Sequence, residues 1–167
     1  RNTRQIGFML GRSLPCGQVK GDDAMKRLQQ KNYSAEKEGE EYILRDLMYS
    51  MMLESHNDTS VCIAEGISTS VEEFTNLMNN KANEIGLKDT YFITPNGLDA
   101  DNGVEKHHTT AYDLAKIMKY CIMDSPQKEE FKKITQTKSY SFSNVKGNRH
   151  FICNNHNSLA DMMEGVI

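Results

Sequence analysis

The stretch LMYSMMLESHNDTSVCIAE, residues 47–65, indicates two consecutive helices with a short polar break between them. Around its first half, apolar residues recur at spacings of three and four, which predicts a helix of about ten residues with one buried face. The residues on that face are Ile43, Leu44, Leu47, Met48, Met51 and Met52. The polar run 54–58 ends this helix, and Asp58, a typical N-cap residue, is expected to start the second one.

More helices are predicted downstream of this pair. Ser70-Val71-Glu72-Glu73 forms a capping box that opens a third helix, and Gly86 suits its C-terminal end. A loop over 89–103 follows, then a helix over 110–123, and Ser125-Pro126 introduces a short helix that ends near Ile134. The residues expected on the inward faces of the third and fourth helices are Val71, Phe74, Leu77, Met78, Ala82 and Ile85, and then Leu114, Ile117, Met118 and Cys121.

The two ends of the chain differ from this helical middle. Polar residues alternate with Tyr140 and Phe142 over 137–143, and 149–153 is expected to be the partner strand of a hairpin. Residues 1–20 lack periodicity and 22–31 could form a short helix, so 1–31 is expected to be an irregular N-terminal segment. A mainly helical lobe followed by a β-hairpin places the chain in the α+β class.

Composition excludes several functional classes. Apolar residues make up 38% and charged residues 26%, which is ordinary for a globular domain. The net charge is -3 without blocks of like charge, which argues against a nucleic-acid partner. Apolar runs are far too short to cross a bilayer, so any membrane association would have to come from parts outside this chain.

The cysteines and histidines do not indicate a metal site. The four cysteines lack the close pairs of a structural zinc site and are Cys16, Cys62, Cys121 and Cys153. Two of them, Cys62 and Cys121, lie among apolar residues on predicted helices, so we expect buried free thiols rather than disulfides. The adjacent histidines 107 and 108 are expected to be solvated on a loop. No metal or other cofactor is therefore predicted.

Residues 47–65 also resemble the second conserved block of serine-type D-alanyl-D-alanine carboxypeptidases, the S11 peptidase family of low-molecular-mass penicillin-binding proteins. The resemblance continues, in family-typical order, through residues 74–82, 84–87, 90–98, 108–115 and 155–159. It implies a β-lactamase/transpeptidase-like α+β fold, of which this chain holds mainly the helical lobe plus a hairpin. Residues 32–167 would form a partial carboxypeptidase domain, preceded by the irregular segment 1–31.

The resemblance implies a serine acyl-enzyme mechanism. In such enzymes the serine of an S-x-x-K motif attacks the D-Ala-D-Ala peptide bond, and its lysine assists removal of the proton. A K-T-G strand binds the terminal carboxylate. By the match to the S-x-N motif, Ser55 would pass the proton to the leaving amine, and Asn57 would orient the substrate's amide. His56 stands where a small residue is commoner, and its side chain could point away.

Two of the three motifs are not identified in these residues. S-x-x-K occurs at 34–37, 125–128 and 143–146, and only Ser34 with Lys37 precedes Ser55 as the family order requires. No apolar run follows Lys37 to bury a nucleophile helix, so the nucleophile stays unassigned, with this pair as the remaining candidate. No K-T-G string occurs. The chain is therefore expected to be incomplete and inactive alone.

The implied partners are peptidoglycan stem peptides as substrate and β-lactams as inhibitors. The implied location is the extracytoplasmic face of a bacterial membrane, or outside the cell. One alternative is a non-catalytic module derived from this fold that binds cell-wall peptide. Another is a relative of the class A β-lactamases, which would also need a Glu-x-x-Leu-Asn loop. The string Thr94-Pro95-Asn96-Gly97-Leu98 favours the carboxypeptidase.

Overall fold

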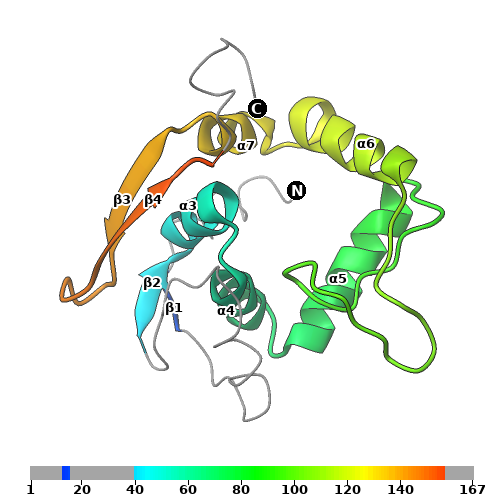
Figure 1. Ribbon diagram of the computed structural model, residues 1–167, viewed down its shortest axis with the longest axis horizontal. Coiled ribbons are helices and arrows are strands. Elements are labelled where there is room, and N and C mark those ends of the chain that lie inside the picture. Colours follow the sequence, from blue (N-terminus) through cyan, green and yellow to red (C-terminus); the bar gives the residue numbers. More distant parts are fainter. Residues whose placement is uncertain (1–12, 16–39, 157–167) are drawn as a thin grey trace.

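The computed structural model describes residues 13–15 and 40–156 of the chain (Figure 1). Strand β1 (Ser13–Pro15) pairs antiparallel with β2 (Glu41–Ile43), and β3 (Ser139–Ser143) pairs antiparallel with β4 (His150–Asn154). The helices between β2 and β3 are α3 (Leu44–Glu54), α4 (Asn57–Ile67), α5 (Val71–Glu84), α6 (Ala111–Lys119), the π-helical turn η1 (Tyr120–Asp124) and α7 (Lys128–Thr135). The predicted α+β class, a helical lobe plus a hairpin, is confirmed.

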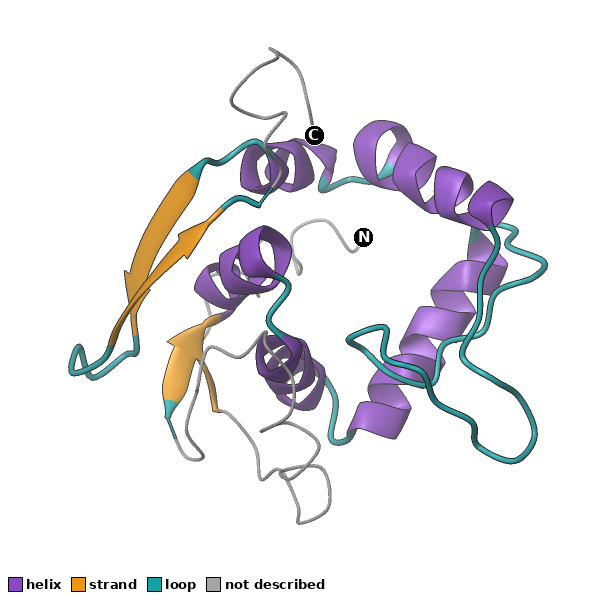
Figure 2. Cartoon of the chain, viewed as in Figure 1, coloured by secondary structure: helices purple, strands orange, loops and turns teal. Residues whose placement is uncertain are grey.

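The helices follow one another around an arc (Figure 2). It runs from α3 through α4 to α5, then through α6 and η1 to α7, which returns to α3. Helix α3 also contacts β2 and both strands of the hairpin, so it lies at the centre of the group formed by α4, α7 and these strands. Among the described residues, no helix is long and apolar enough to cross a membrane.

The core lies between α3 and the two small sheets. Tyr42 and Leu47 are fully buried, and the Tyr42 ring contacts Phe142 and Phe151 edge-on, with ring centroids 6.4 and 5.7 Å apart. The other buried members of this core are Leu44, Tyr49, Leu53, Cys62, Ile63, Ile134 and Cys153. The stripe predicted over residues 43–52 therefore faces the core, except that Met52 is 36% exposed.

A partly buried polar contact joins the hairpin to α3. The Tyr140 hydroxyl donates to the Asp46 carboxylate at 2.7 Å, and the Tyr140 ring stacks on Tyr49 with centroids 3.7 Å apart. Burial raises the pKa of the Asp46 carboxyl, and the hydrogen bond from Tyr140 opposes this. Burial, together with the bond to Asp46, raises the pKa of Tyr140. The hairpin is thus held in one position against the helix that leads into the polar break.

Helix α5 begins as its capping box predicts. The Ser70 side chain accepts from the backbone N–H of Glu73, and Gly86 follows the helix with φ 75, the left-handed region that glycine tolerates. The inward faces predicted for α5 and α6 are only partly correct, since Leu77 is 52% and Leu114 is 50% exposed. Helical spacing shows which residues share a face but not whether another element covers that face.

The loop between α5 and α6 is fastened at two points. The buried Asp113 carboxylate accepts from the backbone N–H groups of Asp89 and Lys88 and from the Thr90 hydroxyl. These hydrogen bonds, led by that from Asp89, hold the pKa of Asp113 below its usual value. The Asn79 amide on α5 both donates to and accepts from the backbone of Phe92 at 2.8 Å.

Strand β1 and the disulfide at Cys62 were not predicted from the sequence. Segment 1–31 was expected to be irregular, and the structure describes one three-residue strand in it, β1. The prediction that Cys62 is a free thiol is wrong, because Cys62 is disulfide-bonded. A disulfide requires Cβ atoms about 3.5–4.5 Å apart, a proximity that spacing along the chain does not indicate. Cys121 and Cys153 keep their thiols.

Candidate active site

Ser55 and Asn57 lie at the junction of α3 and α4, as predicted. Helix α3 ends at Glu54 and α4 begins at Asn57, so only Ser55 and His56 link them. Ser55 has φ 55 and ψ 40, and it is the only non-glycine residue with positive φ among the described residues. This left-handed residue ends α3 one residue before the N-cap of α4, and at the turn Ser55 is exposed and Asn57 half-buried.

The predicted role of Asp58 as N-cap is wrong. His56 occupies the N-cap position, and Asp58 lies in the first turn of α4, where its side chain is 7% exposed and accepts from the Thr59 N–H at 3.0 Å. The helix starts earlier than expected because the left-handed Ser55 completes the change of direction by itself. A negative charge in the first turn is favourable, since the N-terminal end of a helix carries partial positive charge.

The side chain of His56 is turned inward between the two helices and is 9% exposed. Its Nδ1 lies 2.8 Å from the hydroxyl of Ser50 on α3, and that hydroxyl lies 3.1 Å from the Thr59 hydroxyl on α4. Its Nε2 lies 3.2 Å from a carboxylate oxygen of Glu54. The expectation that His56 points away from the motif is confirmed, and its contacts are a buried polar network that sequence reasoning missed.

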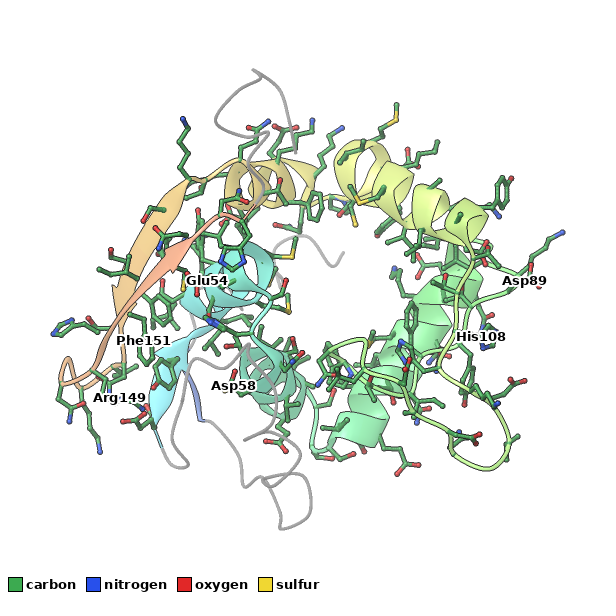
Figure 3. All side chains as sticks on the ribbon, in the orientation of Figure 1. Glu54, Asp58, Asp89, His108, Arg149 and Phe151 are labelled. Atoms are coloured by element: carbon green, nitrogen blue, oxygen red, sulfur yellow. The ribbon has the colours of Figure 1, made fainter. Side chains whose placement is uncertain are left out.

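Glu54 connects this network to the hairpin. Its second carboxylate oxygen accepts from the backbone N–H of Asn154 on β4 at 2.7 Å. Next to it, the carbonyl of Leu53 accepts from the N–H of His156 at 3.4 Å. Figure 3 labels Glu54 at the end of α3, on the side of the hairpin, and Asp58 at the start of α4. The S-x-N turn is therefore bounded by α3, α4 and β4.

The other S-x-x-K matches do not form a nucleophile pair in the structure. The Ser125 hydroxyl accepts from the Gln127 N–H, and the Lys128 ammonium donates to the carbonyl of Met123. The Ser143 hydroxyl is hydrogen-bonded to His150 at 2.6 Å. Ser34 and Lys37 lie outside the described residues. Within the described part of the chain, the turn thus carries Ser55 and Asn57 at the junction of two helices, without an assigned nucleophile.

The histidine pair differs from the sequence-based expectation at one position. His108 is exposed, whereas His107 is partly buried and its Nδ1 accepts from the backbone N–H groups of Ile93, at 3.0 Å, and Thr94, at 3.3 Å. Spacing alone cannot show that the loop folds back over this ring. Among residues 13–15 and 40–156, no group of three or more His, Cys, Asp or Glu side chains could hold a metal ion.

The loop at residues 93–98 is expected to loosen in weakly acidic solution. Burial lowers the pKa of His107; Asp99 opposes this shift and His108 adds to it. A lowered pKa means that the folded loop binds a proton less readily than the unfolded chain does. The contribution of His107 to stability is therefore complete above about pH 6.5 and is lost as the pH falls through its lower folded-state pKa.

NMR titration of the Ile93 and Thr94 amides between about pH 8 and 5 checks this. Both amides should shift together with His107, because a proton on Nδ1 removes the acceptor for their N–H groups. The variant His107→Asn keeps an acceptor near that place without a titrating ring and should abolish the transition. Amide shifts that ignore the titration of His107 would contradict this role.

Comparison with protein families gives one match over most of the chain. The model of the family described as D-alanyl-D-alanine carboxypeptidase, Peptidase_S11, matches residues 18–166. Among curated proteins, D-alanyl-D-alanine carboxypeptidase DacD of Escherichia coli is 36% identical over 109 residues, which are 65% of this chain and 26% of that protein. D-alanyl-D-alanine carboxypeptidase DacF of Bacillus subtilis is 44% identical over 81 residues, 48% of this chain and 20% of that protein.

Solved structures agree with this match. Penicillin-binding protein 6B from Escherichia coli superposes with a TM-score of 0.74 at 28% identity, over 95% of this chain and 47% of that protein. Penicillin-binding protein 5 from Haemophilus influenzae gives a TM-score of 0.72 at 27% identity, over 96% of this chain and 44% of that protein. The chain spans between a fifth and about a quarter of the length of these two curated relatives.

Proposed function

Because this chain belongs to the D-alanyl-D-alanine carboxypeptidase family of S11 peptidases, we propose that the protein removes the terminal D-alanine from peptidoglycan stem peptides. The observation that carries the proposal is the S-x-N turn at residues 55–57. It places Ser55 and Asn57 at the junction of α3 and α4, next to Glu54, which accepts from the backbone N–H of Asn154 on β4. The chain supplies one of the three family motifs in identifiable form.

The proposed reaction proceeds in two steps. A nucleophilic serine, unassigned in these residues, attacks the carbonyl carbon of the penultimate D-alanine, so that an ester bond forms and the C–N bond breaks. The Ser55 hydroxyl passes the serine's proton to the departing amine, which leaves as free D-alanine. The Asn57 amide hydrogen-bonds the substrate's backbone and aligns it. Water then hydrolyses the ester and regenerates the serine.

β-Lactams are proposed as a second class of ligand, because the same serine can attack a lactam carbonyl and open its ring to form a stable ester. The family of penicillin-binding structures that superpose on this chain supports this proposal. Peptide and β-lactam would compete for the same turn at residues 55–57.

An oxidising, extracytoplasmic location is proposed for the protein. Disulfides persist in such compartments and are rare in the cytoplasm of most bacteria. The disulfide at Cys62, buried in the core on α4, supports this location, as does the substrate class. The proposed location includes both the extracytoplasmic face of the membrane and the space outside the cell.

The proposal is tested by intact-mass spectrometry after incubation with a penicillin, followed by peptide mapping of any adduct. The protein is used at its full natural length and, in parallel, as the present 167 residues. We expect one penicillin adduct on a serine in the full-length protein and release of D-alanine from a D-Ala-D-Ala peptide. The present chain should give no adduct, and an adduct on Ser34 would identify that residue as the nucleophile.

The two alternatives predict different results in the same experiment. A non-catalytic peptide-binding module would bind the D-Ala-D-Ala peptide but give no adduct at any length of chain. A β-lactamase relative would give an adduct that disappears within minutes, with turnover of the penicillin and no release of D-alanine. Either result would replace the carboxypeptidase assignment.

A further inference from the structure

We propose that His56, the middle residue of the S-x-N turn, is a positioning residue that holds Ser55 and Asn57 in their reactive geometry. This inference rests on the proposed function and goes beyond it, because His56 itself contacts no reacting group. It is carried by the buried network of Ser50, Glu54, His56 and Thr59.

The donors and acceptors of this network can be ordered from their chemistry. The Glu54 carboxylate can only accept, so its distance of 3.2 Å from Nε2 assigns the hydrogen of the neutral His56 ring to Nε2. In the neutral ring Nδ1 is then an acceptor and takes the Ser50 hydroxyl hydrogen. The Ser50 oxygen in turn accepts from the Thr59 hydroxyl. Each polar atom between α3 and α4 in this chain of bonds therefore has a partner.

The same network can also serve a protonated ring. With hydrogens on both ring nitrogens, Nδ1 donates to Ser50, and the Ser50 hydroxyl rotates to donate to Thr59. Both hydroxyls can act as donor or acceptor, so reversal needs no movement of heavy atoms. The contacts of His56 with Ser50 and of Ser50 with Thr59 therefore fit either arrangement of hydrogens.

The network restrains Ser55 from both sides in the chain. Glu54, before it, is bound to His56 and to the Asn154 N–H on β4. His56, after it, is bound through its ring to α3 and through its carbonyl to the N–H and hydroxyl of Ser60 on α4. Ser50 and Thr59 are fully buried, so water cannot replace these contacts. The left-handed Ser55 is therefore fixed by its neighbours rather than by contacts of its own.

Such fixing matters because proton transfer and substrate alignment depend on small distances. A displacement of about 1 Å in a reacting geometry can cost about 100-fold in rate. A glycine at position 56 would make none of the ring contacts of His56. The turn would then depend on contacts elsewhere in the fold. In this chain, the histidine ring fills the space between α3 and α4 and holds the turn directly.

The test compares His56→Ala, His56→Asn and His150→Ala in the full-length protein. Alanine removes both ring contacts, whereas the oxygen of asparagine can still accept from Ser50. His150→Ala is the matched control, because it breaks another serine–histidine hydrogen bond, to Ser143 on the exposed hairpin. For each variant we would measure the acylation rate with a fluorescent penicillin and the amide hydrogen exchange of residues 54–60 and 75–82.

His56→Ala is expected to slow acylation about 100-fold. Exchange at residues 54–60 should become faster, while exchange at residues 75–82 on α5 stays unchanged, since the loss is local. His56→Asn should recover about a tenth of the wild-type rate or more, and His150→Ala should react like the wild type. Partial rescue by asparagine is the result that anchoring through the hydrogen bond to Ser50 predicts.

Two results would overturn the inference. One is an unchanged acylation rate in His56→Ala. The other is a loss of rate in which exchange rises equally at 54–60 and 75–82, because that marks a general loss of stability. The proposed function fails separately if the wild-type protein is not acylated at all. In that case the exchange data alone decide, and unchanged exchange at residues 54–60 in His56→Ala would refute the anchoring.

Discussion

Under the proposed function, replacement of Ser55 by glycine in the full-length protein is expected to lower the rate of D-alanine release by about 10²–10⁴-fold, the range for loss of a proton-transfer group. The same change is expected to leave the fold as stable as before or to stabilise it by up to about 1.6 kcal/mol. A left-handed conformation costs a side-chain-bearing residue about 1–2 kcal/mol, which glycine avoids. Glycine also makes the unfolded chain more flexible, which offsets about 0.4–1 kcal/mol of the gain.

The matched control is Ser55→Ala, which removes the hydroxyl but keeps Cβ and therefore the backbone cost at φ 55. Alanine should reduce activity as glycine does but give no increase in stability. Peptide hydrolysis gives the rates, and urea unfolding of each variant gives the free energies. Full activity in either variant would rule out Ser55 as the proton relay. A clear loss of stability in Ser55→Gly would contradict the idea that function, not folding, places serine there.

Removal of the disulfide at Cys62 is expected to destabilise the fold by about 2–4 kcal/mol, the usual range for a native cross-link. The variant is Cys62→Ala, chosen because the side chain is only 4% exposed and alanine adds no polar group to the core. The cross-link restricts the unfolded chain and fastens the core around α4. Because α4 carries Asn57, activity should be lost at lower urea concentrations than in the wild type.

Urea unfolding with and without a reducing agent measures this effect. Reduction should lower the midpoint of the wild type to that of Cys62→Ala and should not change the variant. Cys121→Ala is the control, since Cys121 is a partly buried thiol whose pKa is raised by burial and which forms no disulfide. A midpoint of Cys62→Ala equal to that of the wild type would show that the cross-link does not stabilise the fold.

Apolar spacing and capping motifs, which involve residues only a few positions apart, correctly predicted the buried face of one helix and the start of another. The spacing of apolar residues in 43–52 corresponds to the buried face of α3, and the capping box at Ser70 corresponds to the start of α5. The strands of the hairpin and the place of Ser55 and Asn57 at the junction of two helices were also predictable. In each case the determining interactions are between residues close in sequence.

Other features depended on contacts between distant segments and were missed for that reason. Nothing near His107 in the sequence indicates that its ring accepts from the amides of Ile93 and Thr94. The exposure of Leu77 and Leu114 depends on which element covers each helix face. The cross-link at Cys62 depends on how α4 lies relative to other parts of the chain.

The sequence by itself determined the order and type of the elements, the family and the identity of the candidate Ser55 and Asn57, because periodicity and motif order are properties of the chain. Only the tertiary structure decided how these two residues are held. The left-handed turn at Ser55 and the network from Glu54 through His56 to Thr59 exist because α3, α4 and β4 approach one another. A hydrogen bond forms between groups that packing brings to within about 3 Å, and packing is a property of the whole fold.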